Sequence, residues 1–429
     1  MLDIKYIVNN AEEMKENCKN RHVNCDIGAL IDLYQEKNQL QNEVDGLRGR
    51  RNDLSSQIKT ATTETRPALI EESKAIKSDL TEKETRLSEY VQKFNDQLAR
   101  VPNRTHPASP LGKDDSENVE FRRFKSPTAF SVTPKDHIQI GKDLDLIDFE
   151  SANKVSGSKF YYLKNEAVSL EFALIQHALT MLREEGFTLV STPDLARDKI
   201  LEGIGFNPRG KETQVYSIAD SDLCLIGTAE ITLGGMYSGT ILAETELPLK
   251  LAGVSHCFRT EAGSYGQFSK GLYRVHQFTK VEMFAYTTPE ASEAMHQSML
   301  DMEERFFKSL DIPFRTVDIC TGDLGGPAYR KYDLEAWMPG RPGEKKGETG
   351  NWGEITSTSN CTDYQARRLN IKYRPKKGGK AEFVHMLNGT AVAISRALIA
   401  ILENYQKADG SVIVPKVLQD LVGMDVIKR

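Results

Sequence analysis

Residues 30–98 follow a repeat of seven residues. Each of two segments contains two series of residues at that spacing. In the first segment, one series is Leu33, Leu40, Leu47 and Leu54, and the other is Lys37, Val44, Arg51 and Ile58. In the second segment, one series contains Leu69, Ile76 and Tyr90, and the other contains Leu80, Leu87 and Phe94. A polar turn and Pro67 separate the segments. Such seams predict two helices of about 30 residues in an antiparallel hairpin. Because each seam covers one side of its helix, we expect the hairpin to project as an arm.

The pattern changes beyond a proline-rich linker at residues 101–110. Helical stretches such as 165–185 then alternate with β-rich runs such as 249–259 and 278–286, without a strict βαβ rhythm. This order predicts an α+β fold with a mainly antiparallel sheet. We therefore expect two domains, residues 1–103 and 104–429.

Composition excludes several classes of protein. The 429 residues carry a net charge of -5, which argues against a polybasic nucleic-acid binder but not against a local basic patch. The chain has no apolar run of the roughly 18 residues that a membrane span needs, so no membrane partner is expected. Acidic residues near the start, such as Asp3 and Glu12, do not resemble a signal peptide. Six scattered cysteines without a CxxC pair indicate reduced thiols and argue against structural zinc.

The densest candidate chemistry lies at residues 256–284. This segment is typical of two strands joined by a polar, glycine-containing loop. Strand alternation places Phe278, Lys280 and Glu282 on one face, while Arg259 ends the first strand. An aromatic ring, an arginine and a carboxylate on one sheet face could hold a planar base, a phosphate and an ammonium group. A solvated hairpin with one core phenylalanine is the alternative, and this segment alone leaves it open.

Two other segments carry paired polar side chains. Thr228 and Glu230 are two residues apart, and a hydroxyl-rich strand contains Glu354, Ser357 and Ser359. Glu354 and Ser357 are three apart, so a regular strand would direct them to opposite faces, and a bulge or a twist of the strand could bring them together.

A third segment, residues 387–405, is typical of a strand end, a turn at Gly389 and a helix with an apolar side. Arg396 lies within that helix. An arginine there more often forms an ion pair in the core than binds a ligand, so this segment is not decisive alone.

Taken together, these segments resemble the motifs of class II aminoacyl-tRNA synthetases. FRTE at 258–261 with the strand that bears Phe278 resembles the second motif, and GTAVAISRALIAILENYQ at 389–406 resembles the third. Within this class, the sequence most resembles the seryl-tRNA synthetase family. The segments that carry this resemblance are TAE at 228–230, TGDLGGPAYRKYDLEAWMPG at 321–340 and EITSTSNCTDYQARR at 354–368. With the opening residues and the long arm, the resemblance runs essentially end to end.

The resemblance implies an antiparallel sheet flanked by helices, preceded by an N-terminal antiparallel two-helix coiled-coil arm. It implies a homodimer whose interface includes the weaker first motif, at residues 165–195. The implied activity converts L-serine and ATP to seryl-adenylate and pyrophosphate, and then transfers serine to the 3′ end of serine tRNA, with selenocysteine tRNA as a further family substrate. Residues 1–103 would then bind tRNA, and residues 104–429 would carry the catalytic site.

The resemblance also implies residue roles. The serine site would comprise Thr228, Ala229, Glu230, Glu282, Asn388 and Thr390. The ATP site would comprise Arg259, Thr260, Glu261, Arg274, Val275, Phe278, Glu354, Ile355, Thr356, Ser357 and Arg396, with Arg259 and Arg396 catalytic. Magnesium would be held by Glu354 and Ser357.

In this family the arm reaches the long variable arm of serine tRNA, where backbone and shape are recognised. We expect Arg48, Arg50 and Arg51 to make contacts there. On periodicity alone, a dimerisation device or a spacer is the plainer interpretation of the arm.

Two alternatives to a serine–tRNA ligase are a related ligase with another acceptor and, from a different class, a binding or structural protein without activity. A related ligase that charges a carrier protein lacks the long arm, whereas this chain has one. A catalytically dead paralogue should have lost motif residues, yet Arg259, Glu282, Glu354 and Arg396 are all present. We expect a cytoplasmic enzyme, or one of an organellar matrix, since the segment GSYGQFSKGLYR resembles organellar or eukaryotic relatives.

Overall fold

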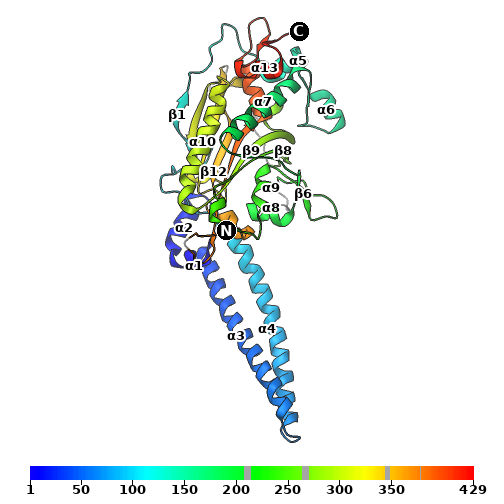
Figure 1. Cartoon of the computed structure of the whole chain (residues 1–429), viewed down its shortest axis with the longest axis vertical. Helices are drawn as coiled ribbons and strands as arrows, with labels where there is room; N and C mark the ends of the chain where they lie inside the picture. The colour runs from blue at the N-terminus through cyan, green and yellow to red at the C-terminus, as the bar shows by residue number, and fades with distance from the viewer. Residues whose placement is uncertain (207–213, 263–269, 344–347, 377) are drawn as a thin grey trace. The chain divides into compact units, whose positions relative to one another are not determined.

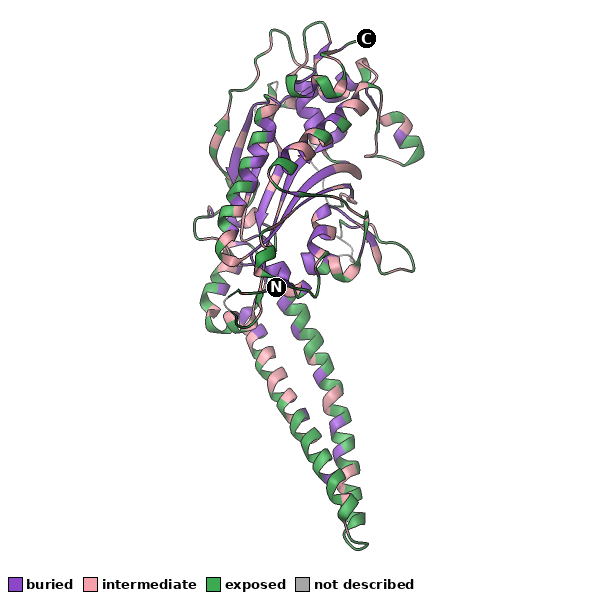
Figure 2. Cartoon of the chain, viewed as in Figure 1, coloured by how far each residue is buried: buried purple, intermediate pink, exposed green. Residues whose placement is uncertain are grey.

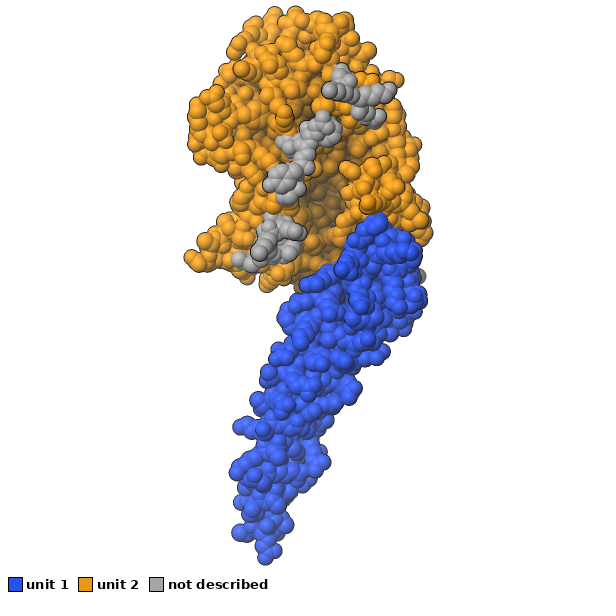
Figure 3. Space-filling model, turned by 180° about the vertical axis from the view of Figure 1, so that it is seen from behind, with its two compact units in different colours: residues 1–104 blue, residues 105–429 orange. Residues whose placement is uncertain are grey.

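The computed structural model describes residues 1–206, 214–262, 270–343, 348–376 and 378–429. Two compact units divide the chain, residues 1–104 and residues 105–429 (Figure 3). No helix among these described residues is long and apolar enough to cross a membrane.

The first unit is helical. Its elements are α1 (Ile4–Asn9), α2 (Ala11–Asn20), α3 (Ile27–Thr60) and α4 (Arg66–Arg100). Asp26 begins α3 by accepting the N–H of Ala29 at 2.9 Å, and Pro67 lies in the first turn of α4, where its missing N–H costs no helix hydrogen bond. Residues 61–65, which are polar except for Ala61, join the two long helices.

The predicted seam of the arm is confirmed. Leu40 and Val44 of α3 form a buried cluster with Leu80 and Leu87 of α4. The other faces of both helices are largely exposed (Figure 2). Ion pairs such as Arg48–Glu84 flank the seam, so burial on one side and charge on the other hold the hairpin together.

The second unit is built on a mainly antiparallel sheet, which confirms the predicted α+β class. In the described residues its eight strands run in the order β1 (Val119–Phe124), β10 (Phe314–Asp318), β11 (Arg330–Pro342), β12 (Thr349–Asn360), β15 (His385–Ala393), β9 (Gln277–Thr287), β8 (Leu249–Phe258) and β4 (Thr188–Ser191). Only the edge pair β4–β8 is parallel among these neighbours. The predicted hairpin corresponds to β8 and β9, and β12 begins earlier than the hydroxyl-rich stretch that suggested it.

Three helices pack on this sheet in one apolar core (Figure 1). They are α7 (Glu166–Glu184), α10 (Ser292–Ser309) and α12 (Ile394–Asn404). Leu170, Phe306 and Leu398, one from each helix, are buried in the same cluster. The predicted helix at 165–185 therefore forms, and its apolar face contributes to the core that supports the central strands.

Shorter elements surround the sheet. The helices are α5 (His137–Asp143), α6 (Phe149–Val155), α8 (Asp198–Ile204), α9 (Ala229–Gly235), α11 (Tyr364–Leu369) and α13 (Gln419–Val422). The strands are β2 (Ile147–Asp148), β3 (Tyr162–Leu163), β5 (Leu195–Arg197), β6 (Leu223–Leu225), β7 (Ile241–Ala243), β13 (Lys372–Arg374), β14 (Glu382–Phe383), β16 (Val412–Ile413) and β17 (Val426–Ile427). The 3-10 helix η3 (Gly271–Tyr273) precedes β9.

The predicted turn at Gly389 is wrong, because β15 runs straight through this residue. A Cβ on Gly389 would lie 2.9 Å from Thr358 Oγ1 and 3.0 Å from Glu303 Oε1 of α10. The glycine therefore serves close packing between β15, β12 and α10 rather than a turn. The departure from regular pairing comes two residues later, where a register shift makes Ala391 a bulge.

Candidate active site

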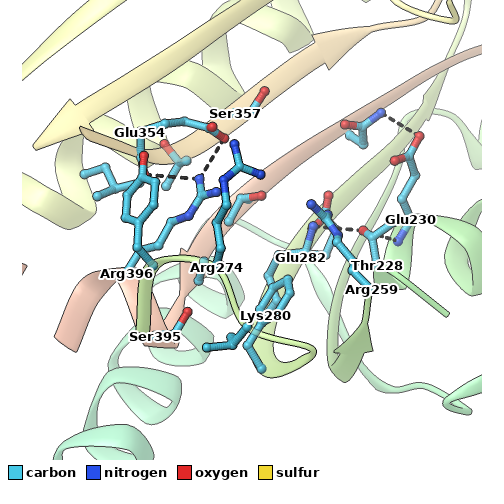
Figure 4. Close-up of a pocket in the computed structure, with 18 of the residues that line it drawn as sticks. Thr228, Glu230, Arg259, Arg274, Lys280, Glu282, Glu354, Ser357, Ser395 and Arg396 are labelled. Carbon is cyan, nitrogen blue, oxygen red and sulfur yellow. Dashed lines mark hydrogen bonds and ion pairs between the residues drawn. The ribbon is translucent and has the colours of Figure 1, made fainter. Parts of the chain in front are cut away.

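A cavity of about 280 Å³ lies on the sheet face opposite α10 (Figure 4). Asn388 and Thr390 of β15 face it, while Gly389 between them faces α10. Strands β9, β12 and β15, the start of α9 and the start of α12 contribute its walls. Segments far apart in the chain therefore meet on one polar surface.

Most of the residues that the sequence singles out line this cavity. They are Thr228, Glu230, Glu282, Asn388 and Thr390 from the serine set, and Arg259, Glu261, Arg274, Val275, Phe278, Glu354, Ile355, Thr356, Ser357 and Arg396 from the ATP set. Ala229 and Thr260 are not part of its wall. Ala229 is buried in the first turn of α9, and the N–H of Thr260 donates to the carbonyl of Gln214 at 3.0 Å. Gly263 and Gly266 of the expected loop lie outside the described residues.

One end of the cavity, which we call the acidic end, is built on a helix cap and a strand. Thr228 begins α9, and its Oγ1 accepts the N–H of Glu230 at 3.1 Å. From β9, Lys280 Nζ donates to the same Oγ1 at 2.9 Å and forms an ion pair with Glu282. Lys280 is 6% exposed and Glu282 2% exposed. A buried lysine thus holds one carboxylate while it anchors the helix cap.

The second carboxylate of the acidic end, Glu230, accepts two amide hydrogen bonds. Gln365 Nε2 donates to its Oε1 at 2.7 Å, and Asn388 Nδ2 donates at 2.9 Å. Burial and the nearby charge of Glu282 raise the pKa of Glu230 to about 7. Burial also raises the pKa of Glu282. Two acids with raised pKa values in one cavity favour a ligand that brings a positive charge.

The other end, which we call the arginine end, is formed by α12, β12 and η3. Arg396 Nη1 lies 2.9 Å from Glu354 Oε1 and donates to the Glu354 carbonyl at 3.1 Å. The ring centre of Tyr273 lies 4.8 Å from the Arg396 guanidinium and 4.2 Å from that of Arg341. Burial favours the neutral acid at Glu354, but the nearby cations, Arg396 and Lys331 first among them, together lower the pKa of Glu354. This end therefore combines delocalised cations with an ionised carboxylate.

In the β8–β9 hairpin, an arginine at the end of β8 lies over an aromatic ring of β9. Arg259 follows β8 directly, and its Nε donates to the carbonyl of Gly227 at 3.2 Å. Its guanidinium lies 5.5 Å from the ring centre of Phe278. The predicted shared face of Phe278, Lys280 and Glu282 is confirmed, because all three line the cavity.

A bulge in β12 brings Glu354 and Ser357 to the same wall. Leu334 of β11 pairs with Thr356, yet the next residue, Glu335, pairs with Glu354. Ile355 is thus the extra residue, and it changes the alternation so that side chains three apart face one cavity. The expected irregularity in this strand is confirmed.

Sequence reasoning missed two residues that shape the cavity. Lys280 lies on the predicted face but was given no role, although a charged residue between Phe278 and Glu282 on that face needs a buried partner. Tyr273 lies in η3, after the loop of the second motif, and no periodic pattern in the sequence distinguishes it.

Comparisons with known proteins agree with this geometry. The family described as "tRNA synthetase class II core domain (G, H, P, S and T)" matches residues 214–405, and the family described as "Seryl-tRNA synthetase N-terminal domain" matches residues 1–105. The matched core contains every cavity residue of the serine and ATP sets.

Relatives match over the whole length. The chain is 54% identical to a serine–tRNA ligase of Treponema denticola, over 100% of both chains. It is 53% identical to that of Rubrobacter xylanophilus, over 100% of this chain and 99% of the relative. A crystal structure of seryl-tRNA synthetase from Pyrococcus horikoshii complexed with ATP is similar, with a TM-score of 0.89, 41% identity and coverage of 100% and 99%. With such identity from end to end, the chain belongs to the seryl-tRNA synthetase family.

Proposed function

We propose that this chain attaches serine to tRNA in two steps, through seryl-adenylate. The observation that carries the proposal is one cavity with two acids, the half-buried Glu230 and the buried Glu282, at one end and Arg396 at the other. An amino acid and a nucleoside triphosphate carry the complementary charges. The second candidate, a carrier-protein ligase, is disfavoured by the long α3–α4 arm, because such relatives lack one.

Serine fits the acidic end by charge and size. Its ammonium group would lie between Glu230 and Glu282, and its hydroxyl would meet Asn388 and Thr390. A buried site that hydrogen-bonds a hydroxyl rejects alanine, because its polar groups would be left unpaired. Threonine would be excluded by its extra methyl group.

ATP fits the arginine end and the β8–β9 hairpin. Adenine would stack on Phe278, and the phosphates would meet Arg259 and Arg396. The serine carboxylate attacks the α-phosphorus in line, a new carboxyl–phosphorus anhydride bond forms, and the bond to the β-phosphate breaks. Pyrophosphate leaves with the bonding electron pair. The step needs no general base, because the carboxylate is already ionised, so positioning and charge stabilisation supply the catalysis.

The side chains at the β12 bulge fit magnesium. Oxygen ligands suit this ion, and Glu354 and Ser357 offer a carboxylate and a hydroxyl on one wall. Asp333 pairs with Ser357 across β11 and β12, and its buried Oδ1 has no hydrogen-bond partner among the described residues. No group of three or more His, Cys, Asp or Glu in the described chain could hold a metal ion. Glu354 and Ser357 would therefore bind magnesium together with phosphate oxygens and water, and the ion would supply positive charge to the phosphates.

The arm would contact the long variable arm of serine tRNA. Of the three arginines expected there, Arg48 pairs with Glu84 and Arg50 pairs with Glu72. Arg51 is exposed, and its side chain has no ion pair with the described residues. Arg51 is therefore our first choice for a phosphate contact.

A homodimer would cover the exposed apolar side chains of the first motif. Phe172 of α7 is 66% exposed, and Leu189 of β4 is 39% exposed. Strand β4 is also an edge of the main sheet. An edge strand beside exposed apolar side chains is a typical interface.

Arg259→Ala tests the adenylation step. Serine-dependent ATP–pyrophosphate exchange should fall about 100- to 1000-fold, because a charge that stabilises the transition state is lost. Arg305→Ala is the matched control, since Arg305 of α10 forms an exposed ion pair with Glu185 at the end of α7. Wild-type exchange in a folded Arg259→Ala variant would contradict the role of Arg259.

The raised pKa of Glu230, about 7, predicts a pH dependence. Below that pH Glu230 holds its proton and cannot pair with the serine ammonium, so kcat/KM for serine should rise with pH from about 5.5 to 7.5, by up to about tenfold per unit. Pyrophosphate exchange at saturating ATP measures it. Glu230→Gln should have low activity and lose this rise. A flat profile in the unmodified enzyme would exclude Glu230 as the ammonium partner.

Replacing residues 30–98 by a short linker tests the arm. Pyrophosphate exchange should persist, whereas aminoacylation of serine tRNA should fall at least about 100-fold, because phosphate contacts supply much of the affinity. Arg51→Ala should weaken tRNA binding and reduce its salt dependence by about one counterion. Lys37→Ala is the control, since Lys37 packs over the Tyr34 ring. Normal charging without the arm would show that tRNA is recognised elsewhere.

Phe172→Glu tests the dimer. A charge at the interface should shift the sedimentation mass toward that of a single 48.1 kDa chain at micromolar concentration. Leu111→Glu, at an exposed residue of a loop, is the control and should leave the mass unchanged. An unchanged mass in Phe172→Glu would remove α7 from the interface.

A further inference from the structure

A buried histidine–glutamate pair lies behind the arginine end and has no role in the steps above. His137 is the first residue of α5, and Glu403 is near the end of α12. His137 Nδ1 lies 2.8 Å from Glu403 Oε1, and their side chains are 9% and 1% exposed. A pair this well buried must be satisfied by its surroundings, so its partners indicate what it holds.

The partners of Glu403 are all donors. Its Oε1 accepts the backbone N–H of His137 at 3.0 Å, and its Oε2 accepts the N–H of Gly340 on β11 at 2.8 Å. Both oxygens therefore act as acceptors. His137 Nδ1 must then carry the proton that points at Glu403, which leaves Nε2 of the neutral ring as an acceptor.

That acceptor holds η3. The N–H of Leu272 donates to His137 Nε2 at 3.1 Å. Gly271 has φ +65°, and a Cβ there would lie 2.1 Å from the same nitrogen. The imidazole edge thus lies directly against the η3 backbone, and glycine is required by both the conformation and the contact.

The position of η3 fixes one side of the arginine end. The ring of Tyr273, the last residue of η3, is close to the guanidinium groups of both Arg396 and Arg341, and the next residue, Arg274, lines the cavity. Arg396 and Glu403 are seven residues apart on α12, which is about two turns, so both lie on the same side of the helix. The helix that carries Arg396 therefore also carries the anchor of η3.

We propose that His137 and Glu403 are positioning residues for ATP: they tie η3 to α12, and so hold Tyr273 and Arg274 in register with Arg396. The inference rests on the proposed role of the arginine end in ATP binding. The acidic end lies on α9, β9 and β15, and none of its hydrogen bonds described above involves η3. Loss of the pair should therefore affect ATP and leave serine binding intact.

Three variants in the full-length enzyme test the proposal. His137→Ala removes the acceptor of the Leu272 N–H. His137→Gln keeps an acceptor there, because the amide oxygen of glutamine reaches about as far as Nε2. His177→Ala is the matched control, since His177 Nε2 bonds Ser309 Oγ at 2.8 Å between α7 and α10, away from η3. Serine-dependent ATP–pyrophosphate exchange gives KM for each substrate, and thermal unfolding reports folding.

We expect KM for ATP to rise about fivefold or more in His137→Ala, as the loss of one buried hydrogen bond allows, with KM for serine within about twofold of the unmodified enzyme. His137→Gln should recover most of the ATP affinity, and His177→Ala should leave both KM values unchanged. Glu403→Gln should behave like His137→Ala, because its amide nitrogen would face one of the three donors.

Two outcomes would overturn the proposal. One is an unchanged KM for ATP in folded His137→Ala. The other is a parallel rise of both KM values that His137→Gln does not relieve, which would mark a merely structural pair. Absence of serine-dependent exchange in the unmodified enzyme would instead refute the proposed function itself, so the two failures are distinguishable.

Discussion

Two carboxylates, Glu230 and Glu282, share one end of a cavity, and this constraint governs the rest of the site. Each negative charge needs a nearby cation or hydrogen-bond donors there, and the two carboxylates have different partners. Lys280 forms an ion pair with Glu282, whereas Glu230 accepts hydrogen bonds from two amides, and burial raises the pKa of both acids. The acidic end therefore holds two acids and one lysine, and the ammonium group of an amino acid would supply a second positive charge there.

The scaffold meets this constraint with rigid elements. The α9 cap at Thr228, the β9 strand and the β15 strand converge on the acidic end, and each belongs to an element that packs in one or both of the apolar cores of the second unit. At the arginine end the same function falls to α12, which extends from the cavity at Arg396 to a buried anchor at Glu403. Elements rather than loops carry both ends, so the described part of the site is formed before any ligand arrives.

Local sequence patterns predicted much of this arrangement, but they could not predict contacts between residues far apart in the chain. The heptads predicted the arm, and strand alternation predicted the shared face of Phe278 and Glu282. Gly389 was misassigned because a glycine before a helix suggests a turn, whereas its actual reason is the approach of Glu303 from α10. The contact of His137 with Glu403 joins residues 266 positions apart, and no pattern along the chain encodes such a pair. The assignment of roles came from the family resemblance rather than from spacing.

Because of the β12 bulge, the shared wall of Glu354 and Ser357 depends on one residue that the pairing of β11 with β12 does not need. Ile355 is a single extra residue between two correctly paired stretches of strand. Deletion of its codon would let β11 and β12 pair in regular register, and Glu354 would then turn away from the wall that holds Ser357. Evolution can therefore extinguish this chemistry in one genetic event while the strands stay paired, which is a route to inactive paralogues that keep the shape of the enzyme.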